Sequence, residues 1–325
     1  MKKLLTFAIV LLLFASCKYK DLCYDHNHEE KPNLTLLLNL KLDLDIDLDV
    51  SEEAHTKIEM PSLQKVCYYD TVSGALLETD FVGAYGGPIH VSPGTYKMVV
   101  YAFDTEWTWI RGEENINTLE AYTSDITDLK MPLFQNFSAK SPSEDAPGPI
   151  IYTPDHLLVT DKVVEIPPYS TEDYSITITA VASTVVETYG FEVTNVTGVE
   201  YISSVEAFVT NQARSNFFGR GEKGTSPATV YFPVEVNKKE GTIKSTFNTF
   251  GKLPGESFSY LHIVVIDTDG HVYSITQDIT DQFDNPEHMI TVDEPIDIPK
   301  PESSGGGIAP TVDDWEEVNQ DVPIG

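Results

Sequence analysis

Apolar and polar side chains alternate strictly in the first long patterned run of the chain. Between residues 40 and 50, Leu, Ile or Val occupies every even position, while Lys41 and four aspartates occupy the odd positions. A period of two places successive side chains on opposite faces of a β-strand. Residues 34–50 are therefore predicted to form a long strand with one buried and one solvated face.

Further runs rich in β-branched and aromatic residues predict more strands along the rest of the chain. Turn residues such as Asp269 and Gly270 separate these runs, and long amphipathic helical patterns are scarce. The predicted fold class is all-β, built of β-sandwiches. The additional strands are expected at residues 65–69, 95–103, 159–166, 174–186, 201–210, 229–236, 241–250, 260–267 and 272–278.

A weak internal sequence similarity divides the strands into two groups. Pro93 and Gly94 precede one strand and Pro254 and Gly255 precede another, and each strand ends at an Asp-Thr pair. Consecutive prolines stiffen a linker, and such a pair occurs at residues 167–168. We therefore predict an N-terminal β-sandwich domain at residues 34–167, a C-terminal β-sandwich domain at residues 168–299, and a linker with a tail segment at residues 300–325.

The N-terminus has the order of an export signal. A basic start is followed by a mostly apolar stretch at residues 4–14 and by small residues directly before Cys17. The apolar stretch is far shorter than the roughly 20 residues that a membrane-spanning helix needs. Residues 1–17 are predicted to be a lipoprotein signal peptide that ends at an acylated Cys17, followed by a polar tether at residues 18–33.

The other end of the chain combines a Gly- and Ser-rich linker with an acidic segment that contains apolar residues. A purely disordered end has no need of a tryptophan, so this mixture indicates a segment that docks. Three fates remain open: docking on a partner, docking on its own domain, or disorder. The residues expected to contact a partner are Trp315, Val318, Val322 and Ile324.

Charge and cysteine content narrow the function. The formal net charge is −30, and the chain has only three arginines, so a nucleic-acid partner is not expected. With Cys17 assigned to lipid, Cys23 and Cys67 form a candidate disulfide of an oxidising compartment. The alternative is that Cys67 is a free, buried residue of a strand.

Few residues suggest chemistry. Metal-ligand types gather at residues 23–29, but on a polar tether they lack a fixed geometry, and the aspartates of residues 43–49 lack the glycine turn of a calcium loop. No metal, cofactor or catalytic residue is predicted, because no nucleophile elbow, phosphate loop or zinc-binding helix motif occurs. Trp107 and Trp109 share one side of an extended segment and are candidates to bind a glycan or a host protein, unless they pack internally.

Several short motifs, in their order along the chain, resemble the fimbrillin-like lipoproteins of Bacteroidales, a family of largely unassigned function related to the anchor and tip subunits of type V pili. They begin with Cys17 and the alternating first strand. The others are DLCYDHNH at residues 21–28, YAFDTEW at 101–107 with Arg111 and Gly112, GTIKSTFNTFG at 241–251, and VDDWEEV at 312–318.

The resemblance implies two transthyretin-like domains, a lipid anchor in the outer membrane with exposure at the cell surface, and pilin subunits as partners. It also implies assembly by strand addition, in which a protease removes the first strand of a stalk subunit and a neighbour's C-terminal strand fills the gap. No arginine lies between Cys17 and Arg111, so an arginine-specific protease could not release this first strand. That favours an anchor or accessory subunit, with a tip subunit or an independent adhesin as alternatives. Thr71 follows an aspartate and resembles an O-glycosylation acceptor of these bacteria.

Overall fold

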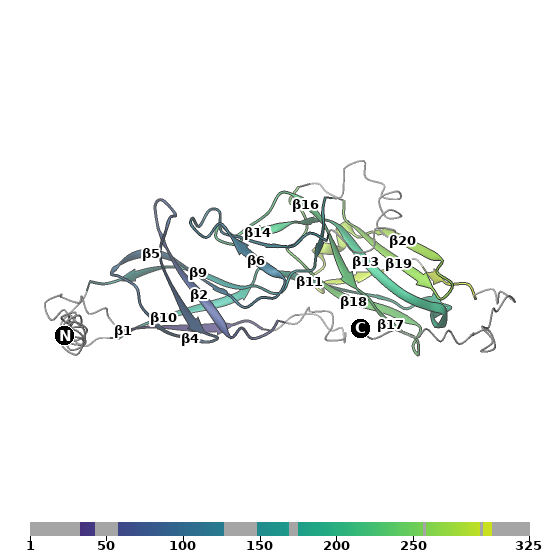
Figure 1. Cartoon of the computed structure of the whole chain (residues 1–325), viewed down its shortest axis with the longest axis horizontal. Coiled ribbons are helices and arrows are strands. Elements are labelled where there is room, and N and C mark those ends of the chain that lie inside the picture. The colour runs from purple at the N-terminus through teal and green to yellow at the C-terminus, as the bar shows by residue number, and fades with distance from the viewer. Residues whose placement is uncertain are drawn as a thin grey trace, which may run out of the picture.

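The computed structural model describes residues 33–42, 58–126, 148–168, 175–255, 258–292 and 295–300. The molecule is elongated, with a barrel formed mainly by the N-terminal strands at one end and the C-terminal sheets at the other (Figure 1). Strands make up almost all of the regular structure in these ranges, which confirms the all-β class. None of the described residues belongs to a helix with the length and apolar character needed to span a bilayer.

Seven strands close into a barrel in the order β1-β10-β9-β5-β2-β3-β4. Two paired positions join β9 to β10 and one joins β3 to β4. Buried side chains of the two strand groups, β9-β5-β2-β3 and β10-β1-β4, meet in one core cluster. The strands are β1 (Asn33–Leu40), β2 (Leu63–Asp70), β3 (Leu76–Gly83), β4 (Gly86–Ile89), β5 (Gly94–Ala102), β9 (Leu158–Ile166) and β10 (Ser175–Thr184).

Two further sheets pack against each other in the C-terminal half. Their strand orders are β20-β19-β13-β16-β8 and β17-β18-β11-β21, and β12 and β22 form a small separate pair. The strands are β8 (Ile150–Tyr152), β11 (Glu187–Val193), β12 (Val196–Thr197), β13 (Ile202–Ala213), β16 (Pro227–Pro233), β17 (Glu235–Asn237), β18 (Thr242–Thr249), β19 (Tyr260–Asp267), β20 (Val272–Asp278), β21 (Met289–Thr291) and β22 (Ile296–Asp297). Short 3-10 helices lie at Val199–Tyr201 and Thr280–Asp284.

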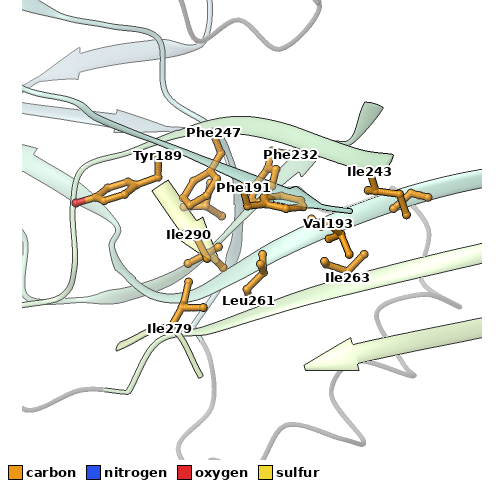
Figure 2. Close-up of a cluster of buried hydrophobic side chains, with 14 of the residues drawn as sticks. Tyr189, Phe191, Val193, Phe232, Ile243, Phe247, Leu261, Ile263, Ile279 and Ile290 are labelled. Carbon is orange, nitrogen blue, oxygen red and sulfur yellow. The ribbon is translucent and has the colours of Figure 1, made fainter. Parts of the chain in front are cut away.

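An aromatic and aliphatic core lies between these two sheets. Figure 2 shows side chains of both sheets, including Phe191, Phe247 and Leu261, gathered in one cluster. Phe232 and Phe247 stack with ring centroids 4.4 Å apart. Burial of such side chains is the main source of stability for a sandwich.

An antiparallel sheet with strands from both halves of the chain, the bridging sheet, connects the two ends of the molecule. Its order is β15-β14-β7-β6, with β6 (Thr108–Arg111), β7 (Glu120–Thr123), β14 (Ser215–Phe217) and β15 (Glu222–Lys223). A core cluster beneath it combines barrel residues such as Cys67 and Tyr101 with Phe218 and Phe250 of the C-terminal half. The two ends therefore share both a sheet and part of a core.

The proposed boundary at residue 168 falls in the connection between two barrel strands. Both β9 and β10 belong to the barrel, and strand pairing moves to the C-terminal sheets only with β11. The reason is that β1 takes β10 as its parallel partner, which draws residues 175–184 back to the N-terminal strands. The division into two domains stays a prediction.

Candidate functional site: the slot of the first strand

The first strand lies in a slot between two barrel strands. β1 pairs in parallel with β10 along its whole length, from Asn33 opposite Ser175 to Leu40 opposite Ala182. On its other side, Leu34–Leu37 pair antiparallel with β4. Backbone hydrogen bonding on both edges is typical of a central strand, so β1 is an integral part of the barrel.

The alternating pattern of the sequence places the inner face of β1 in the barrel core. Leu34, Leu36 and Leu38 are 2%, 0% and 3% exposed, whereas Leu37 between them is 47% exposed. Full burial of a leucine side chain contributes about 1.5 to 3 kcal/mol. Three such side chains hold β1 in the slot more firmly than its hydrogen bonds alone.

A glycine turn closes tightly over β1. Gly86, at the start of β4, has φ of +96°, a conformation that side chains rarely adopt. A Cβ atom at Gly86 would lie 2.0 Å from the carbonyl oxygen of Leu36. Before the turn, the Tyr85 carbonyl accepts a hydrogen bond of 3.0 Å from the Leu38 amide. Only glycine fits at this close approach.

The sequence did not reveal this turn or the parallel partner of β1. β4 has four residues, too few for a periodic pattern, and the Gly86-Gly87 pair was its only local signal. The partner β10 lies about 140 residues further along the chain. After β1, the amide of Lys41 still donates a 3.0 Å hydrogen bond to Ala182, which extends the parallel pairing.

The two candidate tryptophans lie at the start of the bridging sheet. Trp109, in β6, is 55% exposed and faces Tyr122 of β7, over whose ring the Arg111 guanidinium lies at 4.5 Å. Trp107 is 36% exposed, and its ring centroid lies 5.1 Å from that of Tyr152. Thr108 between them is buried, and the role of the two tryptophans in ligand binding stays a prediction.

A cavity of about 500 Å³ lies beside the loop that leads to Trp107. Asp155 lines it and accepts hydrogen bonds from the backbone amides of Trp107 and Thr108. Burial raises the pKa of Asp155 above its ordinary value, although these amides act in the opposite direction. The other lining residues are Ile58, Glu59, Met60, Pro61, Ala102, Asp104, Thr105, Glu106, His156 and Leu158.

Thr71 is exposed in the turn between β2 and β3. The Asp70 carboxylate accepts hydrogen bonds from the amides of Val72 and Ser73, at 3.1 and 2.6 Å. These bonds lower the pKa of Asp70, with the Ser73 amide contributing most. The aspartate of the candidate glycosylation motif thus also stabilises the turn, and glycosylation of Thr71 stays a prediction.

Cys67 is fully buried in β2, and it has no disulfide partner among the described residues. Burial is the main cause that raises its pKa to about 11, so it is protonated and unreactive at neutral pH. Its candidate partner Cys23 lies outside the described residues, and the disulfide stays a prediction. Cys17, Trp315, Val318, Val322 and Ile324 also lie outside them.

Comparison with protein families gives one match that covers most of the chain. Residues 16–233 match a family described as "Domain of unknown function (DUF5119)". The matched range includes the whole barrel, the bridging sheet and the cavity.

Individual proteins of Bacteroidales are also similar. A Bacteroides ovatus protein named "Putative fimbrium anchoring subunit Fim4B" is 24% identical, over 82% of this chain and 86% of its own. A solved structure from B. ovatus, described as "a putative adhesin", has a TM-score of 0.57 at 22% identity and covers 84% of this chain and 94% of its own. The Porphyromonas gingivalis structure described as "the fimbrial anchor protein Mfa2" is more distant, with a TM-score of 0.40 at 15% identity over 77% of this chain and 83% of its own.

Proposed function

The chain belongs to the DUF5119 family of domains of unknown function. We propose that it is a non-catalytic cell-surface subunit of a fimbria, as an anchor or accessory subunit. The relative named as a fimbrium anchoring subunit, which aligns over most of both chains, supports this choice. The partners are pilin subunits, and the contact is made by β-strand addition.

The observation that carries the proposal is the filled slot. β1 is paired on both edges and three of its leucines are buried, so this chain has no vacant position there for a neighbour's strand. The sequence has no arginine before Arg111 at which an arginine-specific protease could remove β1. A subunit that keeps its first strand can end a fibre, because it donates a strand without accepting one.

The proposed donor is the C-terminal segment at residues 308–325. It follows a Gly- and Ser-rich linker, and apolar residues recur at Val318, Val322 and Ile324, all at even positions, which suits one face of a strand. At the opposite terminus, an acylated Cys17 would hold the subunit in the outer membrane. Two acyl chains or more anchor a protein far more firmly than one.

A binding assay tests strand donation. A stalk pilin from the same organism is incubated with the full mature protein, with a version lacking residues 308–325, and with Asp313→Asn as a control that keeps the apolar residues. We expect a stable complex with the full protein and the control, and none with the shortened protein. An unchanged complex after deletion would exclude the tail as donor.

Location is tested separately by protease treatment of intact cells. A surface-anchored subunit is degraded from outside, whereas a periplasmic marker is spared. Replacement of Cys17 by Ala should release the protein from the membrane fraction. Retention of Cys17→Ala in the outer membrane would contradict the proposed lipid anchor.

A second candidate function is an adhesin or tip subunit that binds a glycan or a host protein. The exposed Trp109 beside Tyr122 favours it, because exposed aromatic rings stack well on sugars and peptides. Retention of a soluble glycan that is lost in Trp109→Ala or Trp107→Ala would support this function. Unchanged retention in both variants would argue against it.

A further inference from the structure

Four large apolar side chains are exposed together near the start of β2. They come from the segment before β2, from β2 itself, from β3 and from the position directly after β5, and we refer to them as the apolar ridge. The ridge consists of Met60, Leu63, Phe81 and Phe103, which are 49%, 37%, 46% and 49% exposed.

Local contacts hold the ridge in place. The Phe103 amide donates a 3.1 Å hydrogen bond to the Leu63 carbonyl. The rings of Phe81 and Phe103 meet edge to face, with centroids 5.5 Å apart. The ammonium of Lys65 lies 5.7 Å from the Phe103 ring centroid and is bound by both oxygens of Glu113, at 2.7 and 2.8 Å. The ridge is thus an ordered surface, and Glu113 already neutralises the Lys65 ammonium beside it.

The cavity beside Trp107 adjoins this ridge. Met60 belongs to both, and Phe103 lies between the lining residues Ala102 and Asp104. The volume of about 500 Å³ is within the range of small-molecule and side-chain pockets. Among the lining residues that the structure describes, four carry carboxyl groups and none is Lys or Arg, so this lining complements a positive charge.

The four carboxyl groups fall into two pairs. Asp104 and Asp155 are engaged locally: Ser62 donates two 2.6 Å hydrogen bonds to Asp104, and backbone amides donate to Asp155. Within the described part of the chain, the carboxylates of Glu59 and Glu106 have neither a hydrogen-bond donor nor an ion-pair partner. These two exposed groups are available to an incoming cation.

We propose that the apolar ridge and the adjoining cavity form a docking surface for a partner polypeptide that presents a lysine or arginine flanked by apolar side chains. The cationic side chain enters the cavity between Glu59 and Glu106, and its apolar neighbours cover Phe81 and Phe103. Apolar contact supplies affinity, and the carboxylates select the partner by charge. This interface is separate from the filled slot and includes none of residues 308–325.

Defined peptides test the surface on the full mature protein. The probes are the heptapeptides SLFKFLS and SLFRFLS, with a third peptide that carries norleucine at the central position. Binding is measured by calorimetry at low and at high salt. We expect the two cationic peptides to bind, more weakly at high salt, and the norleucine peptide to bind roughly fivefold or more weakly, because it lacks one energetically important interface contact.

Variants locate the binding. Phe103→Ala and the double change Glu59→Gln with Glu106→Gln should each weaken binding of the cationic peptides by roughly fivefold or more. Val163→Ala and Glu222→Gln change exposed residues elsewhere and should have no effect. Circular dichroism confirms that each variant is folded. The proposal would be overturned by an absence of binding, by equal binding of the norleucine peptide, or by equal binding to the variants. Displacement of the peptide by the sugar N-acetylglucosamine would also overturn it, because the surface would then be a glycan site.

Discussion

Adjacent leucines of β1 have opposite environments, and this contrast fixes the register of the strand. Leu36 is completely buried, whereas Leu37 is 47% exposed. A slip of one residue would exchange the two faces and expose the three buried leucines. Individual side chains of β1 therefore determine how the strand is placed in its slot.

Truncation of Leu36 measures this contribution. We expect Leu36→Ala to lower the free energy of unfolding by about 2 to 5 kcal/mol, because it removes buried methyl groups and leaves a cavity. Leu37→Ala, the matched control on the same strand, should change it by less than about 0.5 kcal/mol. Urea denaturation followed by tryptophan fluorescence gives both values. Similar losses in the two variants would contradict the observed burial of β1.

His262 makes the stability depend on pH. It is 3% exposed in β19, and burial lowers its pKa to about 4. The unfolded chain takes up the proton near pH 6.5, whereas the folded protein takes it up only near pH 4, so acidification between these values favours unfolding.

The expected effect is measurable against a histidine on the surface. Between pH 7.5 and pH 4.5, His262→Gln should lose about 2 to 3 kcal/mol less stability than the unchanged protein. His90→Gln is the control, because the His90 side chain is 71% exposed. Urea titrations at the two pH values provide the comparison. An identical acid sensitivity of His262→Gln and the unchanged protein would show that His262 does not cause it.

At the scale of elements, the chain between β1 and β2 lacks an arginine, and one conservative change can supply it. Lys41 is exposed directly after β1, with its amide still bound to Ala182. In Lys41→Arg, an arginine-specific protease should cut after residue 41 and separate β1 from the rest of the chain.

The cut protein should resemble a stalk subunit whose first strand is exchangeable. Mass spectrometry detects the cleavage, and we expect unfolding of the cut protein at a lower urea concentration, because β1 is then held without a covalent link. Lys97→Arg, in the centre of β5, is the control and should stay uncut, since both of its strand edges are paired. Resistance of Lys41→Arg to the protease would mean that more than the missing arginine protects β1.

The sequence predicted those elements whose pattern is local. The bounds of β19 and β20 match the prediction to the residue, and the buried leucines of β1 follow the alternating pattern. The parallel pairing of β1 with β10 and the position of β4 could not be read, because period-two patterns identify a strand but not its neighbour. The cavity was missed for a similar reason: its lining combines residues 58–61, 102–106 and 155–158, which only the folded barrel brings together.

At the scale of the whole molecule, the bridging sheet links the barrel to the C-terminal sheets. β7 pairs with β14, and the Arg214 guanidinium binds both oxygens of Asp125 at 2.9 Å. Beneath the sheet, Phe218 is 4% exposed and meets the ring of Tyr101 at a centroid distance of 5.4 Å. The proposed role as an anchor requires that force pass between the two ends of the subunit, and this shared core provides the connection.

Phe218→Ala tests whether the two ends unfold as one unit. Removal of this ring should cost about 3 to 5 kcal/mol, and it should fall on the contact between the barrel and the C-terminal half. Phe217→Ala is the neighbouring control, because Phe217 is half-exposed and packs against Arg220 on the surface. We expect the unchanged protein and Phe217→Ala to unfold in a single transition with both fluorescence and circular dichroism, whereas the two probes separate in Phe218→Ala. Coincident transitions in Phe218→Ala would show that the paired strands of the bridging sheet couple the two ends without the core. In that variant β14 keeps its backbone hydrogen bonds to β7.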